Sequence, residues 1–183
     1  MSRRAVFLDR DGVINVECGE HIRHPEDLQL LPGSAAAIAA LSKAGWPIVV
    51  YTNQSGVGRG YMSMADLDAI HDTLRCQVEI YGGELTAIYA CTHHPNEGCD
   101  CRKPKPGMLL QAASEHDLDM AASFAVGDSP RDIAAANAAG CSPVLVLSGS
   151  TTEYTRDQFP TAQPKHVFPD LSAFAKWLLD PSV

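Results

Sequence analysis

Short apolar runs alternate with longer, helix-like stretches along this chain. Each apolar run is followed by glycine or polar residues, which is typical of buried strands that end in turns. We therefore expect strands at about residues 5–8, 46–51, 85–90, 123–126 and 143–147, with a short strand near 166–168. Helices are expected at about 32–44, 63–81, 106–116, 130–140 and beyond 170, with irregular loops at about 15–31 and 148–164.

Local start signals support the expected helices. Ser63 and Asp66 have the spacing of a capping box, in which each side chain binds the backbone N–H of the other residue. Pro106 and Pro130 suit first helical positions, and Asp170 is expected to cap the last helix. Repeated strand–helix units of this kind predict an α/β fold, a three-layer Rossmann-like parallel sheet with helices on both faces.

Polar side chains gather where three of the expected strands end. Asp9 and Asp11 follow the first strand, Thr52 and Asn53 follow the second, and Asp128 follows the fourth. In a parallel sheet, such strand ends meet at one crevice. Asp9 and Asp11 are two residues apart, so in extended backbone they point to the same side, and their repulsion favours a bound cation. Magnesium fits this site, because it prefers a few carboxylate oxygens together with water and phosphate.

The composition limits the class of protein and its partners. The chain has 183 residues, of which 45% are hydrophobic and 20% charged, as expected of a single globular domain over residues 1–183. Its net charge of −8 argues against nucleic acid or an anionic membrane as the main partner. No apolar run approaches the roughly 20 residues of a membrane span. The first expected strand begins by about residue 5, which leaves no room for a secretion signal, so we expect a cytoplasmic protein.

Three of the six cysteines lie between residues 91 and 101. Cys91, Cys99 and Cys101, together with a nearby histidine, have the density of a closed zinc site with four ligands. Both His93 and His94 satisfy this pattern. Free buried thiols, or a disulfide beside a surface histidine, are the alternatives. The remaining cysteines have no partners in the sequence and are expected to be ordinary core or loop thiols: Cys18, Cys76 and Cys141.

The strand-end motifs resemble those of haloacid-dehalogenase-type phosphatases, and the resemblance spans the whole chain. Four family motifs are matched by the segment 9–13, by Thr52, by Lys103 within Lys-Pro-x-Pro, and by Asp128 with Asp132. Within this family, the chain most resembles the heptose-1,7-bisphosphate 7-phosphatases, on the stretches 8–15, 52–61 and 101–108. The resemblance implies that there is no large cap domain and that loops alone shape the pocket. It also implies a zinc-binding loop over 91–101, with His93 as the fourth ligand.

The resemblance further implies a role for each matched residue. Asp9 is expected to attack phosphorus and form an aspartyl-phosphate, and Asp11 to act as acid and then base. Magnesium is expected on Asp9, Asp128 and the backbone carbonyl of Asp11, whereas Asp132 is expected to orient its neighbours. The expected catalytic residues are Asp9, Asp11, Thr52 and Lys103, and the expected substrate-binding residues are Arg10, Asn53, Gln54, Ser55, Arg102 and Lys103.

The implied reaction is removal of the 7-phosphate of D-glycero-D-manno-heptose 1,7-bisphosphate, in the synthesis of nucleotide-activated heptose for lipopolysaccharide or other surface polymers. The implied cofactors are catalytic Mg²⁺ and structural Zn²⁺, the partner is a small sugar phosphate, and we expect a monomer. Histidinol-phosphate phosphatase is the nearest alternative, because that enzyme shares the zinc cluster. A non-enzymatic phospho-acceptor domain is less consistent with Asp11, because an acid–base residue serves turnover. A zinc-stabilised binding module would leave the strand-end motifs unexplained.

Overall fold

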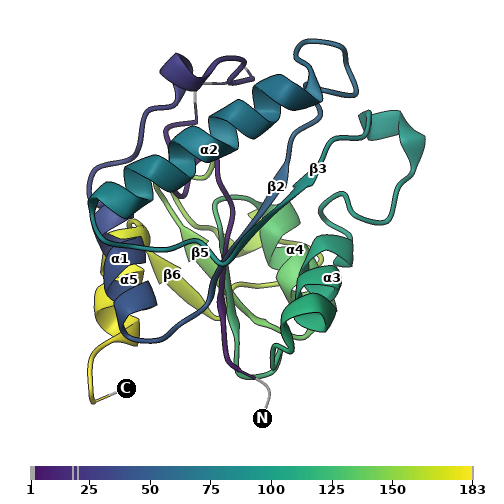
Figure 1. Cartoon of the computed structure of the whole chain (residues 1–183). Coiled ribbons are helices and arrows are strands. Elements are labelled where there is room, and N and C mark those ends of the chain that lie inside the picture. The colour runs from purple at the N-terminus through teal and green to yellow at the C-terminus, as the bar shows by residue number, and fades with distance from the viewer. Residues whose placement is uncertain (1–2, 18, 20, 183) are drawn as a thin grey trace.

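Six parallel strands form one sheet at the centre of the computed structural model, which describes residues 3–17, 19 and 21–182 (Figure 1). In space the strands run in the order β3-β2-β1-β4-β5-β6. Their bounds are β1 Val6–Leu8, β2 Ile48–Asn53, β3 Ala87–Cys91, β4 Phe124–Gly127, β5 Ser142–Val146 and β6 His166–Phe168. Because β1 lies between β2 and β4, the strand order reverses at β1, and a crevice is expected at its carboxyl end.

Helices cover both faces of the sheet, which confirms the predicted three-layer α/β fold. In the described residues they are α1 Ser34–Lys43, α2 Met64–Ile80, α3 Gly107–His116, α4 Pro130–Ala139 and α5 Leu171–Leu178. The helices α1, α2 and α5 lie together on one face, and α3 and α4 lie together on the other (Figure 1). Among the described residues, no inserted unit as large as a cap domain interrupts the alternation of strands and helices.

Alternate residues of β1 explain why both faces of the sheet must be covered. Val6 and Leu8 belong to the core under α1, α2 and α5, whereas Phe7 points to the core under α3 and α4. All three side chains are fully buried, as expected for a central parallel strand. Burying one side chain of this size contributes about 1.5–3 kcal/mol. The strand is therefore fixed from both sides, and so are the residues that follow it.

The predicted helix starts at α2 and α5 are confirmed by their caps. Ser63 Oγ accepts a hydrogen bond from Asp66 N, and Asp66 Oδ2 accepts one from Ser63 N. Asp170 accepts one from the backbone of the first turn of α5. The third strand differs from the prediction, because it begins at Ala87 and not near residue 85. The side chain of Leu85 is buried, as in a strand. Its carbonyl oxygen, however, accepts a hydrogen bond from Arg75 of α2 and not from a neighbouring strand.

The predicted loops contain short 3-10 helices, namely η1 Pro25–Asp27, η2 Pro95–Glu97 and η3 Arg156–Gln158. A single turn shows no apolar periodicity, so the pattern of the sequence could not indicate it. Of the scattered cysteines, Cys141 is buried, Cys76 is exposed, and both are free thiols. Cys18 lies outside the described residues.

Candidate active site

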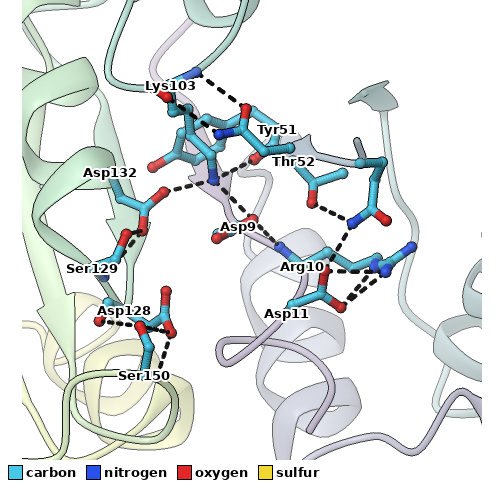
Figure 2. Close-up of polar contacts among 12 residues, drawn as sticks. Asp9, Arg10, Asp11, Tyr51, Thr52, Lys103, Asp128, Ser129, Asp132 and Ser150 are labelled. Atoms are coloured by element: carbon cyan, nitrogen blue, oxygen red, sulfur yellow. Dashed lines mark hydrogen bonds and ion pairs between the residues drawn. The ribbon is translucent and has the colours of Figure 1, made fainter. Parts of the chain in front are cut away.

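The carboxyl ends of β1, β2 and β4 meet at one crevice, as the sequence predicts. A cavity of about 320 Å³ opens there. Its lining includes Asp9, Thr52, Lys103, Asp128, Asp132 and Ser150. Figure 2 shows these side chains turned toward one another from the strand ends, the following loops and, for Asp132, the first turn of α4. Carboxylates, a hydroxyl and an ammonium group are thus gathered around one space that a phosphate could enter.

Asp9 lies directly after β1, at the centre of this group (Figure 2). Its Oδ1 accepts a hydrogen bond from the backbone N–H of Arg10 at 2.7 Å and lies 2.9 Å from the Lys103 ammonium. Burial raises the pKa of Asp9, Lys103 opposes this, and the carboxylates of Asp132 and Asp128 add to the rise, so that the pKa is about 8. A divalent cation among these carboxylates would favour the ionised form of Asp9.

Lys103 joins two of the acidic residues. Its Nζ lies 2.6 Å from Asp132 Oδ1 and 2.9 Å from Asp9 Oδ1, and it donates to the carbonyl oxygen of Tyr51 at 3.2 Å. Burial opposes the charged form, but Asp132 and Asp9 raise the pKa of Lys103. Its backbone is held by the Asn53 side chain, which accepts from Lys103 N at 3.1 Å and donates to Lys103 O at 3.3 Å. Asn53, predicted to bind substrate, thus also positions the lysine.

Three carboxylates could share a cation. Oxygens of Asp9, Asp128 and Asp132 all lie within 4.8 Å of one another. Asp128 Oδ2 accepts from the backbone N–H and the hydroxyl of Ser150, and burial together with Asp132 raises the pKa of Asp128 to about 6. The loop after β1 passes so close that a Cβ at Gly12 would lie 2.4 Å from Asp128 Oδ2, and the φ of Gly12 is +80°, so only glycine fits. Clustered carboxylate oxygens are the donors that magnesium prefers.

Asp132 is itself fully engaged. One of its oxygens faces Lys103, and the other accepts from the backbone N–H of Ser129 at 3.0 Å and from the Ser129 hydroxyl. These contacts, together with Lys103, lower the pKa of Asp132 although burial opposes it. The arrangement is consistent with the expected orienting role of Asp132.

Asp11 lines the crevice, but its carboxylate is held from the side away from Asp9 (Figure 2). Arg10 Nη2 lies 2.9 Å from Oδ1 and 3.1 Å from Oδ2, Asn15 donates to Oδ1 at 2.9 Å, and Gln54 donates to Oδ2 at 2.8 Å. Burial opposes the charged form, but these donors lower the pKa of Asp11. The same Gln54 amide nitrogen donates to Thr52 Oγ1 at 2.9 Å, which leaves the hydroxyl proton of Thr52 available for a ligand.

Arg10 does not reach the crevice in this structure. Its side chain is fully buried, and its guanidinium lies against Asp11 and, at 3.5 Å, against His71 of α2. In this structure the guanidinium of Arg10 contacts Asp11, and the substrate contact expected of Arg10 stays a prediction. Sequence reasoning did not find His71 or Asn15. The only signal for Asn15 was its place in the family-like segment 8–15.

A second cavity, of about 350 Å³, adjoins the first, and the two share Asp11, Glu17, Gly19, Asn53 and Arg131 in their linings. Arg59 and Arg102 also line the second cavity, so three guanidinium groups surround it. Arg102 Nη1 is buried and has no hydrogen-bond partner among the described residues. Guanidinium groups of this kind suit a phosphate or carboxylate ligand. Sequence reasoning found Arg102 but missed Arg59, which lies in the family-like stretch 52–61, and Arg131, which lies between Asp128 and Asp132.

The predicted zinc ligands converge beyond β3. The ligand atoms of Cys91, His93, Cys99 and Cys101 lie within 4.8 Å of one another, with Cys99 Sγ 3.6 Å from Cys91 Sγ and 3.5 Å from Cys101 Sγ. A tetrahedron with Zn–S bonds of about 2.3 Å has edges of about 3.8 Å, so this donor set fits zinc. His94 instead accepts a hydrogen bond from the backbone of η2, which leaves His93 as the histidine of the cluster.

Comparisons with known proteins agree with this geometry. Residues 100–174 match a family model described as HAD-hydrolase-like. The chain is 45% identical to D-glycero-beta-D-manno-heptose-1,7-bisphosphate 7-phosphatase of Pseudomonas aeruginosa, over 98% of this chain and 99% of that protein. Its identity to the enzyme of the same name from Bordetella bronchiseptica is 44%, over 96% of this chain and 98% of that protein. The chain belongs to the heptose-1,7-bisphosphate 7-phosphatase family.

Solved structures place the fold in the same family. The crystal structure of D,D-heptose 1,7-bisphosphate phosphatase from B. bronchiseptica, complexed with magnesium and phosphate, superposes with a TM-score of 0.89 at 42% identity, over 96% of this chain and 98% of that chain. A HAD-like phosphatase from Mesorhizobium loti superposes with a TM-score of 0.80 at 31% identity, over 97% and 88%. The predicted family and phosphatase class are thus confirmed. No helix in the described residues has the length and apolar character of a membrane span.

Proposed function

We propose that the chain hydrolyses the 7-phosphate of D-glycero-D-manno-heptose 1,7-bisphosphate, in the synthesis of nucleotide-activated heptose. The observation that carries this proposal is the pair of adjoining cavities. Asp9 and Lys103 line the first, and three arginines line the second. A sugar with a phosphate at each end can place one phosphate against Asp9 while the other binds the arginines. The names of the two bacterial relatives support the same substrate.

In the first half of the reaction, Asp9 is the nucleophile. One of its carboxylate oxygens attacks phosphorus in line with the sugar oxygen, the bond from phosphorus to that oxygen breaks, and an aspartyl-phosphate forms. Asp11 would serve as the acid for the leaving sugar oxygen. Because its hydrogen-bond donors lower its pKa in this structure, it must first take up a proton. In the second half, Asp11 takes a proton from a water molecule that attacks phosphorus. Inorganic phosphate leaves, the Asp9 carboxylate is restored, and Asp11 is again protonated.

Catalysis of phosphoryl transfer consists mostly of positioning and of charge neutralisation. The Thr52 hydroxyl, whose oxygen already accepts from Gln54, would donate its proton to a phosphoryl oxygen. The Lys103 ammonium, held between Asp9 and Asp132, would neutralise the charge of the same group. Asn53 would contribute mainly by positioning Lys103, because the Asn53 side-chain amide forms hydrogen bonds with both the backbone N–H and the carbonyl oxygen of Lys103.

Two metals fit the residues that are present. Mg²⁺ would be held by the carboxylates of Asp9 and Asp128, with the backbone carbonyl of Asp11 as a further ligand by analogy with the family. When bound, it would neutralise the repulsion between nucleophile and phosphate. Zn²⁺ would be structural, because its four ligands leave no open position. The zinc ligands would be Cys91, His93, Cys99 and Cys101.

A substrate panel tests this proposal. With Mg²⁺ present, phosphate release is measured from both anomers of heptose 1,7-bisphosphate, from heptose 7-phosphate and from histidinol phosphate. We expect kcat/KM for the preferred bisphosphate to exceed the other values by about tenfold or more, which corresponds to about 1.4 kcal/mol of transition-state binding. A preference for histidinol phosphate would support the alternative substrate. Absence of phosphate release from all of them would contradict the proposal.

A further inference from the structure

Residues 148–150, directly after β5, lie against two loops of the first cavity, and we call this segment the serine clamp. At its start, Ser148 Oγ donates a hydrogen bond to the carbonyl oxygen of Gly12 at 2.8 Å, across 136 positions of the chain. At its end, Ser150 donates to the carboxylate of Asp128. Gly12 belongs to the loop after β1 and Asp128 follows β4, so the serine clamp connects the two strand ends that carry the proposed magnesium ligands.

Ser150 holds only one oxygen of the Asp128 carboxylate. Its backbone N–H lies 2.6 Å and its hydroxyl 2.7 Å from Oδ2, and the next backbone N–H, of Thr151, donates to the carbonyl oxygen of Asp128 at 3.2 Å. The other oxygen, Oδ1, accepts no hydrogen bond from the described residues and is turned to the space between Asp128 and Asp9 (Figure 2). The contacts of Ser150 thus leave a carboxylate oxygen free on the side where a cation would bind.

A direct contact with the phosphate is the alternative role of Ser150, because this residue also lines the first cavity. A hydroxyl group has a single proton to donate. In this structure, both the hydroxyl and the backbone N–H of Ser150 donate to Asp128, so neither is available to a phosphoryl oxygen. Thr52 differs in this respect, because its oxygen accepts from Gln54 and its proton remains available. The geometry therefore favours a positioning role for Ser150.

Gly149 allows the serine clamp to approach both loops closely. A Cβ at this position would overlap Asp128 Oδ2 and would lie 2.6 Å from the Cα of Gly12. Backbone therefore packs directly on the carboxylate, with no side chain between them. Asp128 is only 3% exposed, so it has little room to turn away from the cavity.

This restraint matters because ionised carboxylates as close as those of Asp9 and Asp128 repel each other until a cation lies between them. Donors to the far oxygen of Asp128 act against that repulsion and keep its other oxygen directed toward the cation. Carboxylates that bind a metal are in general held by such hydrogen bonds, and loss of the partner typically lowers metal affinity or activity about 10- to 100-fold.

We propose that the serine clamp positions Asp128 for Mg²⁺ through Ser150, and that Ser148 ties the loop after β1 to the same segment. This inference rests on the proposed function, because Mg²⁺ is the cation of that reaction. Ser150 binds neither the cation nor the phosphate and transfers no proton. It acts through the orientation of Asp128, so its loss should weaken metal binding more than the chemical step.

The test measures metal affinity in the full chain without substrate. Mn²⁺ is the probe, because carboxylates bind it as they bind Mg²⁺ and electron paramagnetic resonance measures the free ion. Ser150→Ala removes the hydroxyl, Ser150→Thr keeps it, and Ser148→Ala removes the link to Gly12. Asp128→Asn removes the proposed ligand and so locates the site. Ser114→Ala is the matched control, because Ser114 is an exposed serine of α3.

We expect Ser150→Ala to raise the dissociation constant of Mn²⁺ about 10-fold, the lower end of the usual range, because the backbone N–H still donates to Asp128. Ser148→Ala should raise it about threefold, because its hydrogen bond reaches the metal site only through the loop. Ser150→Thr should recover most of the affinity, and Ser114→Ala should bind as the wild type does. The Mg²⁺ concentration for half-maximal phosphate release should follow the same order, and excess Mg²⁺ should restore most of the kcat of Ser150→Ala.

Other outcomes separate the clamp from the proposed function. A wild-type chain that releases no phosphate would contradict the proposed function, whereas the Mn²⁺ affinities of the variants still decide the role of the clamp. Unchanged Mn²⁺ affinity in Ser150→Ala, or a raised KM for the sugar phosphate at saturating Mg²⁺, would overturn the positioning role. Wild-type Mn²⁺ binding by Asp128→Asn would overturn it as well. Circular dichroism confirms folding, and if Ser150→Ala does not fold, Ser148→Ala decides the question.

Discussion

The carboxylates of the crevice differ in their surroundings. Asp9 is buried among other acids, which raise its pKa to about 8 in spite of Lys103. Asp11 is surrounded by donors, which lower its pKa. Asp128 is held by Ser150, and its pKa of about 6 is raised by burial and by Asp132. A cation is therefore needed most between Asp9 and Asp128, where ionised carboxylates repel each other.

Asp9→Asn is expected to abolish turnover, because the amide keeps the shape of the side chain but is a poor nucleophile. We expect phosphate release to fall by about 10³-fold or more, the scale seen when a nucleophile is removed from other enzymes. The melting temperature without metal should be unchanged or higher, because one of several repelling acids is gone. Asp157→Asn, at an exposed position of η3, is the control and should retain full activity. Wild-type rates for Asp9→Asn would contradict the assignment.

Arg102→Ala tests the second cavity. The guanidinium has a buried nitrogen without a hydrogen-bond partner in the described residues, so a distal phosphate would satisfy it. Loss of a hydrogen bond to a charged group costs about 1.5–3 kcal/mol, so KM for the bisphosphate should rise about 10- to 100-fold. KM for heptose 7-phosphate should change less than about threefold. Steady-state kinetics on both substrates, beside the exposed control Arg156→Ala, would show whether Arg102 distinguishes them.

At the scale of elements, the segment between β3 and α3 links the zinc cluster to the catalytic lysine. Cys101 is two residues from Lys103. The side chain of Asn53, at the end of β2, forms hydrogen bonds with both the backbone N–H and the carbonyl oxygen of Lys103. The glycine-rich loop after β2 packs directly on this segment, because a Cβ at Gly58 would lie 2.4 Å from the backbone nitrogen of His94. Ordering a free loop costs about 1–2 kcal/mol of conformational entropy per residue. A bound zinc would order this loop before the substrate binds, so that substrate binding would not have to order it.

Cys101→Ser is therefore expected to lower bound zinc and kcat/KM together, while most helix and strand content remains. Elemental analysis and steady-state kinetics on the same preparation measure the two effects. Cys76→Ser is the matched control, because Cys76 is a free and exposed thiol on α2. A zinc-depleted Cys101→Ser protein with full activity would show that the loop keeps its shape without the metal.

The helix α2 carries a histidine that resists protonation. Burial and then Arg10 lower the pKa of His71 from 6.5 to about 4. Between these two values the unfolded chain binds the proton and the folded chain does not, so the contribution of His71 to stability falls as the pH falls through this window. We measure the free energy of unfolding in urea at pH 6.5 and at pH 4 for the wild type and for His71→Gln. The decrease in this free energy between the two pH values should be smaller in His71→Gln by on the order of 1–2 kcal/mol. The expected difference is modest because the ring is partly exposed. Parallel stability curves for the two proteins would contradict this.

At the scale of the molecule, the sheet and much of the site could be predicted because apolar runs end at chemically distinctive residues. Asp9, Thr52 and Asp128 each follow a strand, and parallel strands bring such residues together. The order of the strands is not visible in the sequence, so Ser150 was missed. It follows β5 and reaches Asp128 only because β5 pairs with β4. The contact between Arg10 and Asp11 could not be predicted either, because the motif shows the type of the residue but not the direction of its side chain.

The position of β1 in the sheet has a consequence for the order in which this protein can become active. β1 is synthesised early, yet one of its two neighbours is β4, and the hydrogen bond from Ala5 N to Ser123 Oγ spans 118 positions. Contacts so distant in the chain form slowly, because a long loop must close first. A nascent chain that stops before β4 holds Asp9 without Asp128. During refolding, recovered phosphatase activity should therefore report closure of the sheet, and it should lag behind the helix signal.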